Sequence, residues 1–275
     1  MGRFSRLIQL SVSDLCMASD ASALVLLHGI LMSGSAWQDV VPLVSKYHRV
    51  FTPTSAGHRG GPPLPRSPAT VSDLVDAAER YLDDRGLDRP HLVGLSLGGW
   101  MAIELARRGR ATTVCALAPA GFWSAGDSAQ AHVRKQVRKF VTMGRLARPV
   151  LPVAALAMKS ATVRRIGFRD AACHADRITA AQSVELLDDI LGATVNVDDL
   201  IGSDEEMAPL DPLPCPVTIG WSENDAIIQV AVADKIARKR MPQASFTILP
   251  GVGHLPMVDD PDLVAHTILL VTGAR

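Results

Sequence analysis

Residues 91–100 read HLVGLSLGGW and place one serine between two glycines, each two positions away. The residues before Ser96 form a short apolar run typical of a buried strand, and those after it fit a helix, so the serine falls at the turn between them. A turn this tight strains the backbone and brings strand and helix close together, and Gly94 and Gly98 leave no Cβ atom to collide. A serine that only caps a helix is the plainer interpretation. The rest of the chain must decide between the two.

The charge balance argues against a chain-wide electrostatic role. The 275 residues include 28 Lys and Arg against 28 Asp and Glu, so no overall field suggests nucleic acid or an anionic membrane as the main partner. No apolar run approaches the length of a membrane span, and the N-terminus has no convincing signal-peptide core. We therefore expect a cytoplasmic protein with no nucleic-acid or membrane partner, of unspecified oligomeric state.

The four cysteines are widely spaced and form no C-x-x-C pair: Cys16, Cys115, Cys173 and Cys215. Such cysteines suit reduced thiols that serve as small core residues. The chain also shows no metal-ligand spacing and no dinucleotide-binding fingerprint. We therefore expect neither a metal nor a cofactor.

Short apolar runs alternate with longer helical patterns, which is typical of βαβ units and a mainly parallel sheet. Helices are predicted at residues 71–85 and 97–108, and residues 7–12 suggest an antiparallel hairpin at the sheet edge. The strands are predicted at residues 23–27, 49–53, 90–94, 113–117, 217–221 and 245–249.

This alternation stops between about residues 122 and 207, where the sequence reads as several helices. Charge segregates there: residues 128–169 contain ten basic side chains and no acidic one, whereas residues 170–211 contain eleven acidic side chains and one basic. We therefore predict a core domain of residues 1–122 and 208–275 with a helical cap at residues 123–207.

Two later segments offer partners for the serine. Residues 222–225, SEND, follow one predicted strand, and residues 250–254, PGVGH, follow the next. A serine hydroxyl is a weak nucleophile at neutral pH, so it needs a general base that is itself oriented by an acid. His254 can serve as the base, and both Glu223 and Asp225 are candidates for the acid.

The sequence resembles the α/β-hydrolase superfamily over nearly its whole length. The resemblance rests on LLHG at residues 26–29, GLSLGG at 94–99, GWSENDAII at 220–228, GVGHLPMVDDPD at 251–262, and the helical insertion. It implies an α/β-hydrolase fold, in which helices flank a twisted, mainly parallel sheet and an inserted helical cap covers it.

The resemblance also implies roles for individual residues. Ser96 is the expected nucleophile, His254 the general base and then acid, and Asp225, in preference to Glu223, the carboxylate that fixes the imidazole tautomer. The backbone N–H groups of Ile30 and Leu97 are the expected oxyanion hole.

Other residues near these motifs have weaker assignments. His28 is expected to bond nearby backbone, and His58 to hold its own loop or, less favoured, to contact substrate. His58, Trp123 and Leu255 are the candidate pocket residues. A separate group of cap cations recurs at helical spacing and either pairs with the acidic half of the cap or docks an anionic substrate or partner such as an acyl carrier: Arg134, Lys135, Arg138 and Lys139.

The identity of the residue at the turn, Ser96, limits the classes of reaction that the protein can be expected to catalyse. Haloalkane dehalogenases and epoxide hydrolases of the superfamily use aspartate there, so Ser96 disfavours both. We predict acyl chemistry on a small-molecule ester, thioester or lactone through an acyl-serine intermediate, with water as acceptor. The alternatives are an acyltransferase or thioesterase of a biosynthetic pathway, whose cap excludes water, and a ligand-binding protein on the same fold with little turnover.

Overall fold

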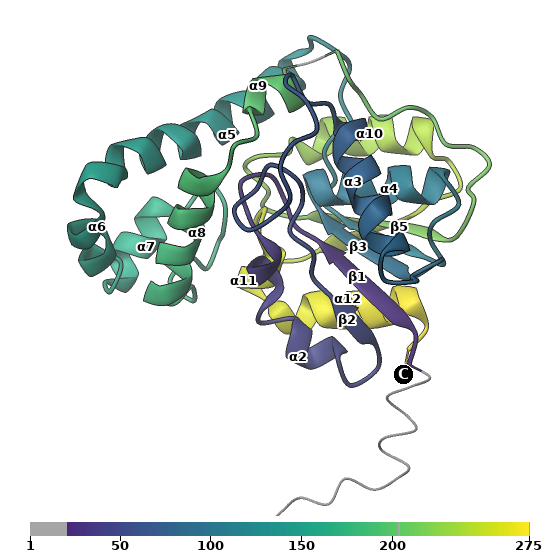
Figure 1. The fold of residues 1–275 in the computed structure, drawn as a ribbon, viewed down its shortest axis with the longest axis horizontal. Coiled ribbons are helices and arrows are strands. Elements are labelled where there is room, and N and C mark those ends of the chain that lie inside the picture. Colours follow the sequence, from purple (N-terminus) through teal and green to yellow (C-terminus); the bar gives the residue numbers. More distant parts are fainter. Residues whose placement is uncertain (1–20, 203, 275) are drawn as a thin grey trace, which may run out of the picture.

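Six parallel strands form one sheet in the order β2-β1-β3-β4-β5-β6 (Figure 1). The structure is a computed structural model that describes residues 21–202 and 204–274. The predicted hairpin at residues 7–12 and Cys16 lie outside this range. The strands are β1 (Ala23–Leu27), β2 (Arg49–Phe51), β3 (His91–Leu95), β4 (Val114–Leu117), β5 (Val217–Ser222) and β6 (Ser245–Leu249).

The central strands are largely apolar because the sheet is covered on both faces. In β1, Val25 and Leu27 pack into one hydrophobic cluster, while Leu24 and Leu26 pack into another. Successive strand residues point to opposite faces, so a sheet buried on both sides needs a continuous apolar run. This explains why these short runs could be recognised in the sequence.

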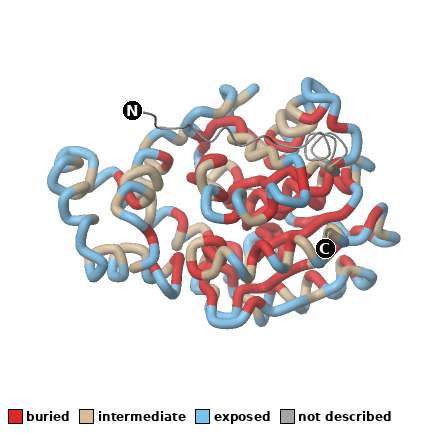
Figure 2. Tube along the Cα trace, turned by 90° about the horizontal axis from the view of Figure 1, so that it is seen from below, coloured by how far each residue is buried: buried red, intermediate tan, exposed pale blue. Residues whose placement is uncertain are grey.

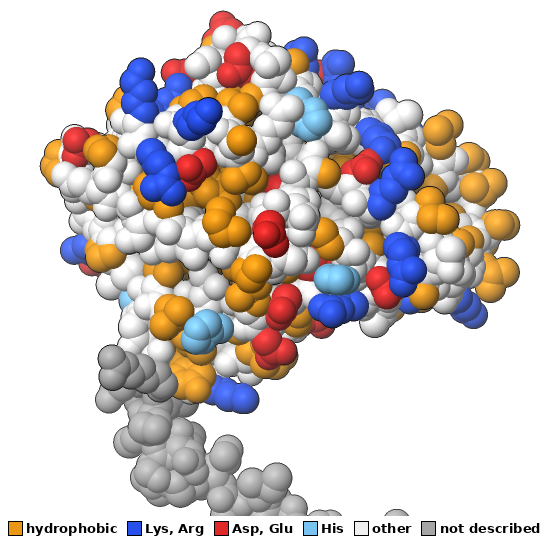
Figure 3. Space-filling model, turned by 180° about the vertical axis from the view of Figure 1, so that it is seen from behind, with side chains coloured by type: hydrophobic (Ala, Val, Ile, Leu, Met, Phe, Trp, Pro, Cys, Tyr) orange, Lys and Arg blue, Asp and Glu red, His pale blue; other side chains and the backbone are white. Residues whose placement is uncertain are grey.

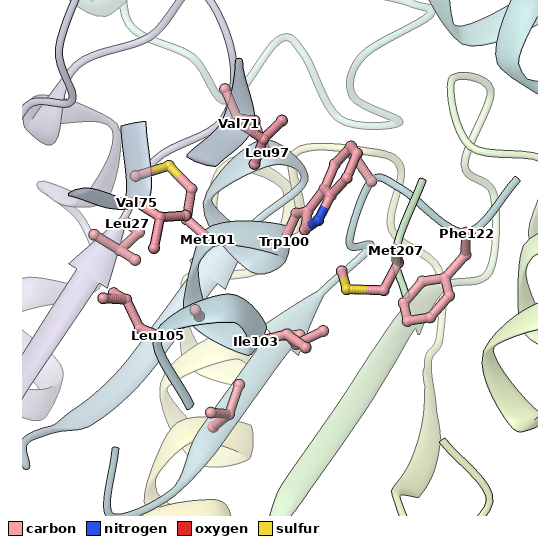
Figure 4. Close-up of a cluster of buried hydrophobic side chains, with 14 of the residues drawn as sticks. Leu27, Val71, Val75, Leu97, Trp100, Met101, Ile103, Leu105, Phe122 and Met207 are labelled. Atoms are coloured by element: carbon pink, nitrogen blue, oxygen red, sulfur yellow. The ribbon is translucent and has the colours of Figure 1, made fainter. Parts of the chain in front are cut away.

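Helices cover the two faces. One face carries α3 (Val71–Asp83), α4 (Leu97–Arg107) and α10 (Val230–Arg240), and the other carries η1 (Gly34–Trp37), α2 (Val41–Val44), α11 (Pro256–Asp259) and α12 (Pro261–Thr272). Figure 4 shows Trp100, Met101 and Leu105 of α4 among Leu27 of β1 and Val71 and Val75 of α3. Helix α4 is therefore built into the core along its length.

The cap is a set of helices between β4 and β5. It consists of α5 (Ser128–Ala147), η2 (Arg148–Val150), α6 (Leu151–Ala157), α7 (Ala161–Gly167), α8 (Ala180–Gly192) and α9 (Val197–Leu200). The helical segment Ser128–Ala157 is long and apolar enough, by length and composition, to cross a membrane. The expectation that no segment reaches that length was therefore wrong. Figure 2 shows buried backbone concentrated in the core and mostly exposed backbone at the far end of the cap.

The two ends of the cap are joined to each other and to the core. The Met207 N–H donates to the Gly121 carbonyl at 2.8 Å, and Met207 lies beside Phe122 in Figure 4. Within the cap, Arg138 pairs with Asp198 and Lys139 with Asp170. Two of the four cap cations singled out in the sequence thus pair with the acidic half of the cap.

A buried carboxylate ties α8 to the core. Asp189 is 1% exposed. It accepts a 2.7 Å hydrogen bond from the Ser33 hydroxyl and a 2.6 Å bond from Arg59 Nε, both contributed by core loops. Burial raises the pKa of Asp189, although Ser33 and Arg59 oppose that shift.

One cysteine departs from the expectation of small core residues. Cys115 and Cys215 are buried, but Cys173 is exposed. Its backbone N–H donates to Asp259 at 3.0 Å, which holds this cap loop against the core by its main chain and leaves the side chain at the surface.

We predict that Gly98→Ala destabilises the fold by about 1–3 kcal/mol or more. A Cβ atom there would lie 2.2 Å from the Leu27 carbonyl oxygen, a backbone atom that cannot rotate away. Gly167→Ala is the control, because a Cβ atom there meets nothing within 4 Å. Urea unfolding of both variants measures the difference, and equal stability would contradict the proposed close approach.

We predict that Asp189→Ala lowers the free energy of unfolding at pH 7 by about 1–3 kcal/mol, because Ser33 and Arg59 lose their shared partner. Asp189→Asn tests the charge. Since the folded-state pKa is raised, wild type is relatively more stable below the ordinary aspartate pKa and loses that advantage over Asp189→Asn as pH rises through the raised value. Urea unfolding between pH 4 and 7 measures both effects, and a difference that does not change with pH would contradict the assigned shift.

Candidate active site

Ser96 occupies a strained turn between β3 and α4. Its backbone has φ 52° and ψ −113°, a left-handed conformation that side chains rarely adopt. The Ser96 N–H donates to the Leu117 carbonyl at 2.9 Å, which fixes the residue to the end of β4. A Cβ atom on Gly94 would lie 2.1 Å from the Gly98 carbonyl oxygen, so the flanking glycines are sterically required. The hydroxyl is thereby held at the N-terminus of α4.

His254 and Asp225 form a buried pair after neighbouring strands. His254 Nδ1 lies 2.8 Å from Asp225 Oδ2, and the exposed fractions of their side chains are 7% and 0%. Asp225 Oδ1 accepts from the backbone N–H groups of Ile227 and Ile228, both at 2.8 Å. The carboxylate is thus fixed by its own loop and orients the imidazole ring.

Glu223, the competing carboxylate, is used differently. Its Oε2 accepts from the Gly251 N–H at 2.8 Å and braces the loop that leads to His254. Of the two acidic candidates from the sequence, Glu223 and Asp225, it is Asp225 that contacts His254.

Ser96 and His254 line one apolar cavity of about 80 Å³. In the part of the chain that the structure describes, no hydrogen bond joins the Ser96 hydroxyl to the imidazole ring. Such bonds are often long in empty sites and tighten when substrate binds. The remaining lining consists of Gly29, Ile30, Leu31, Met32, Leu95, Val137, Phe140, Phe168, Ala171, Leu186, Ile190, Ile227 and Leu255. Core and cap therefore both build the wall, and among the described residues Ser96 and His254 supply its only polar side chains.

Two backbone amides beside this cavity are free to donate. Among residues 21–202 and 204–274, neither the Ile30 nor the Leu97 N–H has a hydrogen-bond acceptor. Leu97 opens α4, where N–H groups have no partner within the helix. Leu31 has φ 62°, so the chain turns sharply just after Ile30. These two amides are the donors expected from the sequence.

His28 is a structural histidine. Its Nδ1 donates to the Gly29 carbonyl at 2.8 Å, and its Nε2 accepts from the Ser55 N–H at 2.9 Å. This arrangement requires the neutral ring, and burial together with His58 lowers the pKa of His28 to about 3. Both ring nitrogens are occupied, as expected from the motif.

Of the three candidate pocket residues, only Leu255 lines the cavity. His58 packs edge-on against His28 at 5.0 Å, and its Nδ1 donates to the Ala56 carbonyl at 3.1 Å. Burial lowers the pKa of His58 to about 4. It therefore holds its own loop.

Trp123 is buried at the base of the cap. It packs edge-on against Trp100, and its indole N–H donates to the Glu205 carbonyl at 3.2 Å. The assignment of His58 and Trp123 to the pocket wall was wrong because the cap turns inward through Val137, Phe140 and Phe168 instead.

The sequence analysis assigned no role to Asp259, although it quoted the segment that contains it. This fully buried carboxylate accepts from the backbone N–H groups of Gly253, Cys173 and His174 at 2.7, 3.0 and 2.6 Å. It thus joins the residue before His254 to a loop of the cap. An acid five positions after the histidine was the available signal, but two of its three partners, Cys173 and His174, lie more than 80 residues away in the sequence.

The described residues contain no group of three or more His, Cys, Asp or Glu side chains that could hold a metal ion. The polar groups at the cavity are a hydroxyl and a carboxylate-oriented imidazole, with the free amide of Ile30 in the lining and that of Leu97 directly after Ser96. Such a set can activate a nucleophile and bind a developing oxyanion.

Comparison with known proteins gives relatives of several activities. An epoxide hydrolase of Mycobacterium tuberculosis is 28% identical over 202 residues, which cover 71% of this chain and 91% of that protein. A pimeloyl-[acyl-carrier protein] methyl ester esterase of Aromatoleum aromaticum is 27% identical over 245 residues, covering 87% and 93%. The solved structure of an enol-lactonase from Burkholderia xenovorans shares the fold with a TM-score of 0.68, at 21% identity over 92% of each chain.

The family model described as the alpha/beta hydrolase family matches residues 24–267, which span the sheet, the cap and both loops of the site. The chain belongs to the alpha/beta hydrolase family.

Proposed function

We propose that this protein is a serine hydrolase that cleaves a carboxylic ester, thioester or lactone through an acyl-serine intermediate. Ser96 is the nucleophile, His254 the general base and acid, and Asp225 the carboxylate that orients it. The observation that carries the proposal is that one apolar cavity contains Ser96 on its strained turn and an imidazole held at 2.8 Å by a buried carboxylate.

The reaction begins with attack of Ser96 Oγ on the substrate carbonyl carbon, while His254 Nε2 takes the hydroxyl proton. Asp225 keeps Nδ1 protonated, so that Nε2 is the basic nitrogen. The carbonyl oxygen becomes an oxyanion and accepts from the amides of Ile30 and Leu97.

Collapse of this intermediate breaks the bond to the leaving group, and His254 returns the proton to the departing alcohol or thiol. Water then attacks the acyl-serine with His254 again as base, which releases the acid and regenerates Ser96. The apolar wall supplied by Phe140, Phe168 and Ile190 favours a largely apolar acyl or alcohol group.

Epoxide hydrolysis is the second candidate, because a relative of that name covers 71% of this chain. Chemistry disfavours it. Attack of Ser96 on an epoxide carbon would form an ether, which has no carbonyl for water to attack and would trap the enzyme. Turnover of an epoxide that persists in Ser96→Ala would favour direct attack by water and this second function.

Transfer to an acceptor other than water remains a related alternative. The relative named as an esterase of a pimeloyl-[acyl-carrier protein] methyl ester makes carrier-bound esters a reasonable class to test. Comparing acyl transfer to added alcohols or thiols with hydrolysis separates the two fates of the acyl-serine. A protein that binds ligand without turnover would form no acyl-serine with any of these substrates.

The first test is labelling with a fluorophosphonate probe, followed by mass spectrometry of the modified peptide. We expect the label on Ser96 in wild type and none in Ser96→Ala. In His254→Ala, we expect labelling to slow by about two to four orders of magnitude through loss of the general base. Folded wild type that takes no label, or takes it elsewhere, would contradict the proposal.

A matched pair of variants tests the choice of carboxylate. Asp225→Asn is expected to lower kcat on a p-nitrophenyl ester by about four orders of magnitude, since the amide favours the wrong imidazole tautomer. Glu223→Gln retains an acceptor for the Gly251 N–H and is expected to change kcat by less than about tenfold. Steady-state kinetics decide, and the reverse ranking would make Glu223 the catalytic acid.

A further inference from the structure

Exposed hydrophobic side chains gather at the far end of the cap. Among the described residues, ten large hydrophobic side chains are exposed, and six of them lie between residues 143 and 166. Figure 3 shows hydrophobic side chains over the end of the molecule formed by the cap, with Lys and Arg side chains beside them. We call this set the apolar tip: Met143, Leu146, Val150, Val153, Leu156 and Ile166, with exposed fractions of 38, 71, 49, 66, 63 and 62%.

The apolar tip is an organised surface. Met143 and Leu146 are three residues apart on α5, and Val153 and Leu156 are three residues apart on α6, so each pair lies on one side of its helix. Val150 lies in η2 between them. Helices α6 and α7 form the end of the cap that projects away from the sheet (Figure 1). Exposed apolar side chains gathered at one end of a molecule indicate an interaction site.

Uncompensated positive charge accompanies the tip. Arg145, Arg148 and Lys159 are exposed, and none of them has an ion-pair partner within the described chain. Elsewhere in the cap, Arg138, Lys139 and Arg165 each pair with a carboxylate. Residues 128–169 contain no acidic side chain of their own. Glu185 and Asp188 of α8 line a surface hollow together with Lys159, so Arg145 and Arg148 are the cations furthest from compensation.

The same segment is suited to lie on a membrane and unsuited to cross one. Arg145 and Arg148 fall within its apolar stretch, and the helix is interrupted by η2, with prolines at 149 and 152. A spanning helix excludes such charges, whereas an interfacial helix buries aliphatic side chains at the headgroup boundary and keeps its cations beside anionic lipid.

The interior of the cap connects this surface with the candidate active site. A second cavity, of about 160 Å³, lies inside the cap and is lined by Met143 of the tip and by Met158. It shares three walls with the catalytic cavity: Phe140, Phe168 and Ile190. A cavity on the order of 150 Å³ holds one benzene molecule. The catalytic cavity is about 80 Å³, and the cavity behind its shared walls offers a longer apolar group room on the side of the tip.

We propose that the apolar tip docks this protein on the surface of an anionic lipid bilayer, with the aliphatic side chains at the headgroup boundary and Arg145, Arg148 and Lys159 against lipid phosphates. An acidic carrier protein would satisfy the cations but leave the protruding aliphatic side chains in water. The balanced net charge had suggested no membrane partner, but the local distribution supports one. This docking does not require the proposed reaction, because binding is measured without turnover.

The test is co-sedimentation with vesicles of phosphatidylcholine containing about one third phosphatidylglycerol. The tip variant is Leu146→Gln, Val153→Gln and Leu156→Gln combined, none of which lines the catalytic cavity. Its matched control exchanges three exposed apolar residues outside the cap: Val232→Gln, Ile248→Gln and Leu270→Gln. The tip variant is expected to bind at least about tenfold more weakly than wild type, and the control within about twofold.

A cation variant combines Arg145→Gln, Arg148→Gln and Lys159→Gln. It is expected to bind the vesicles more weakly than wild type, and its binding is expected to depend less on salt concentration. Circular dichroism and fluorophosphonate labelling of Ser96 check that each variant is folded. Ser96→Ala is expected to bind as wild type does, so failure of the catalytic proposal would leave this result intact.

Three outcomes would overturn the docking proposal. The first is wild type that does not sediment with the anionic vesicles, and the second is equal binding by wild type and a folded tip variant. The third is a wild type that is dimeric by analytical ultracentrifugation with a monomeric tip variant, which would make the tip an interface between two copies. Binding that does not change with the phosphatidylglycerol content or with the salt concentration would refute the role of the cations.

Discussion

The close approach of α4 to the strands beneath it leaves no room for a side chain at Gly94 or Gly98. Because the helix lies so near, the chain must turn within one residue, and Ser96 is held at φ 52°. The same approach lets α4 pack along its length against the sheet and α3, so the energy that maintains the strained serine comes from the burial of Trp100, Met101 and Leu105. The packing of α4 in the core and the position of the Ser96 hydroxyl therefore depend on the same close approach.

Two buried carboxylates extend this constraint to the cap. Asp189 joins α8 to core loops through Ser33 and Arg59, whereas Asp259 joins the loop before His254 to residues 173 and 174. Buried carboxylates that lack such donors would be strongly destabilising. Each therefore favours one position of the cap over the cavity that contains Ser96 and His254, and together they let a largely helical insertion complete an apolar wall.

The sequence predicted the sheet well because a strand buried on both faces must be apolar throughout. Helix bounds and strand bounds agree with the structure within about two residues. Ser96 and His254, both named from the sequence, line one cavity, and Asp225 contacts His254 from outside its lining. What could not be predicted depends on how the cap packs. Trp123 was a candidate for the core or the pocket wall, and the sequence did not decide between them. Asp259 had no assigned role because two of its three partners are remote in sequence. Likewise, aliphatic residues at helical spacing read as a core face, and only the packed structure shows that Leu146 and Leu156 stay uncovered.

The loop at residues 171–174 lies within the cap in the sequence, but its hydrogen bonds join it to the segment around His254. The Leu255 N–H donates to the Ala171 carbonyl at 2.8 Å. The Asp259 carboxylate accepts from the backbone N–H groups of Cys173 and His174 in the same loop. When caps are exchanged between relatives, by evolution or by protein engineering, the chains therefore cannot simply be joined at the two ends of the insertion. A transplanted cap must carry its own version of this loop, or the recipient loses the register of its histidine. New substrate preferences are more readily acquired by replacing only the outer helices, α6 and α7, which make no such bonds to the catalytic loops among the described residues.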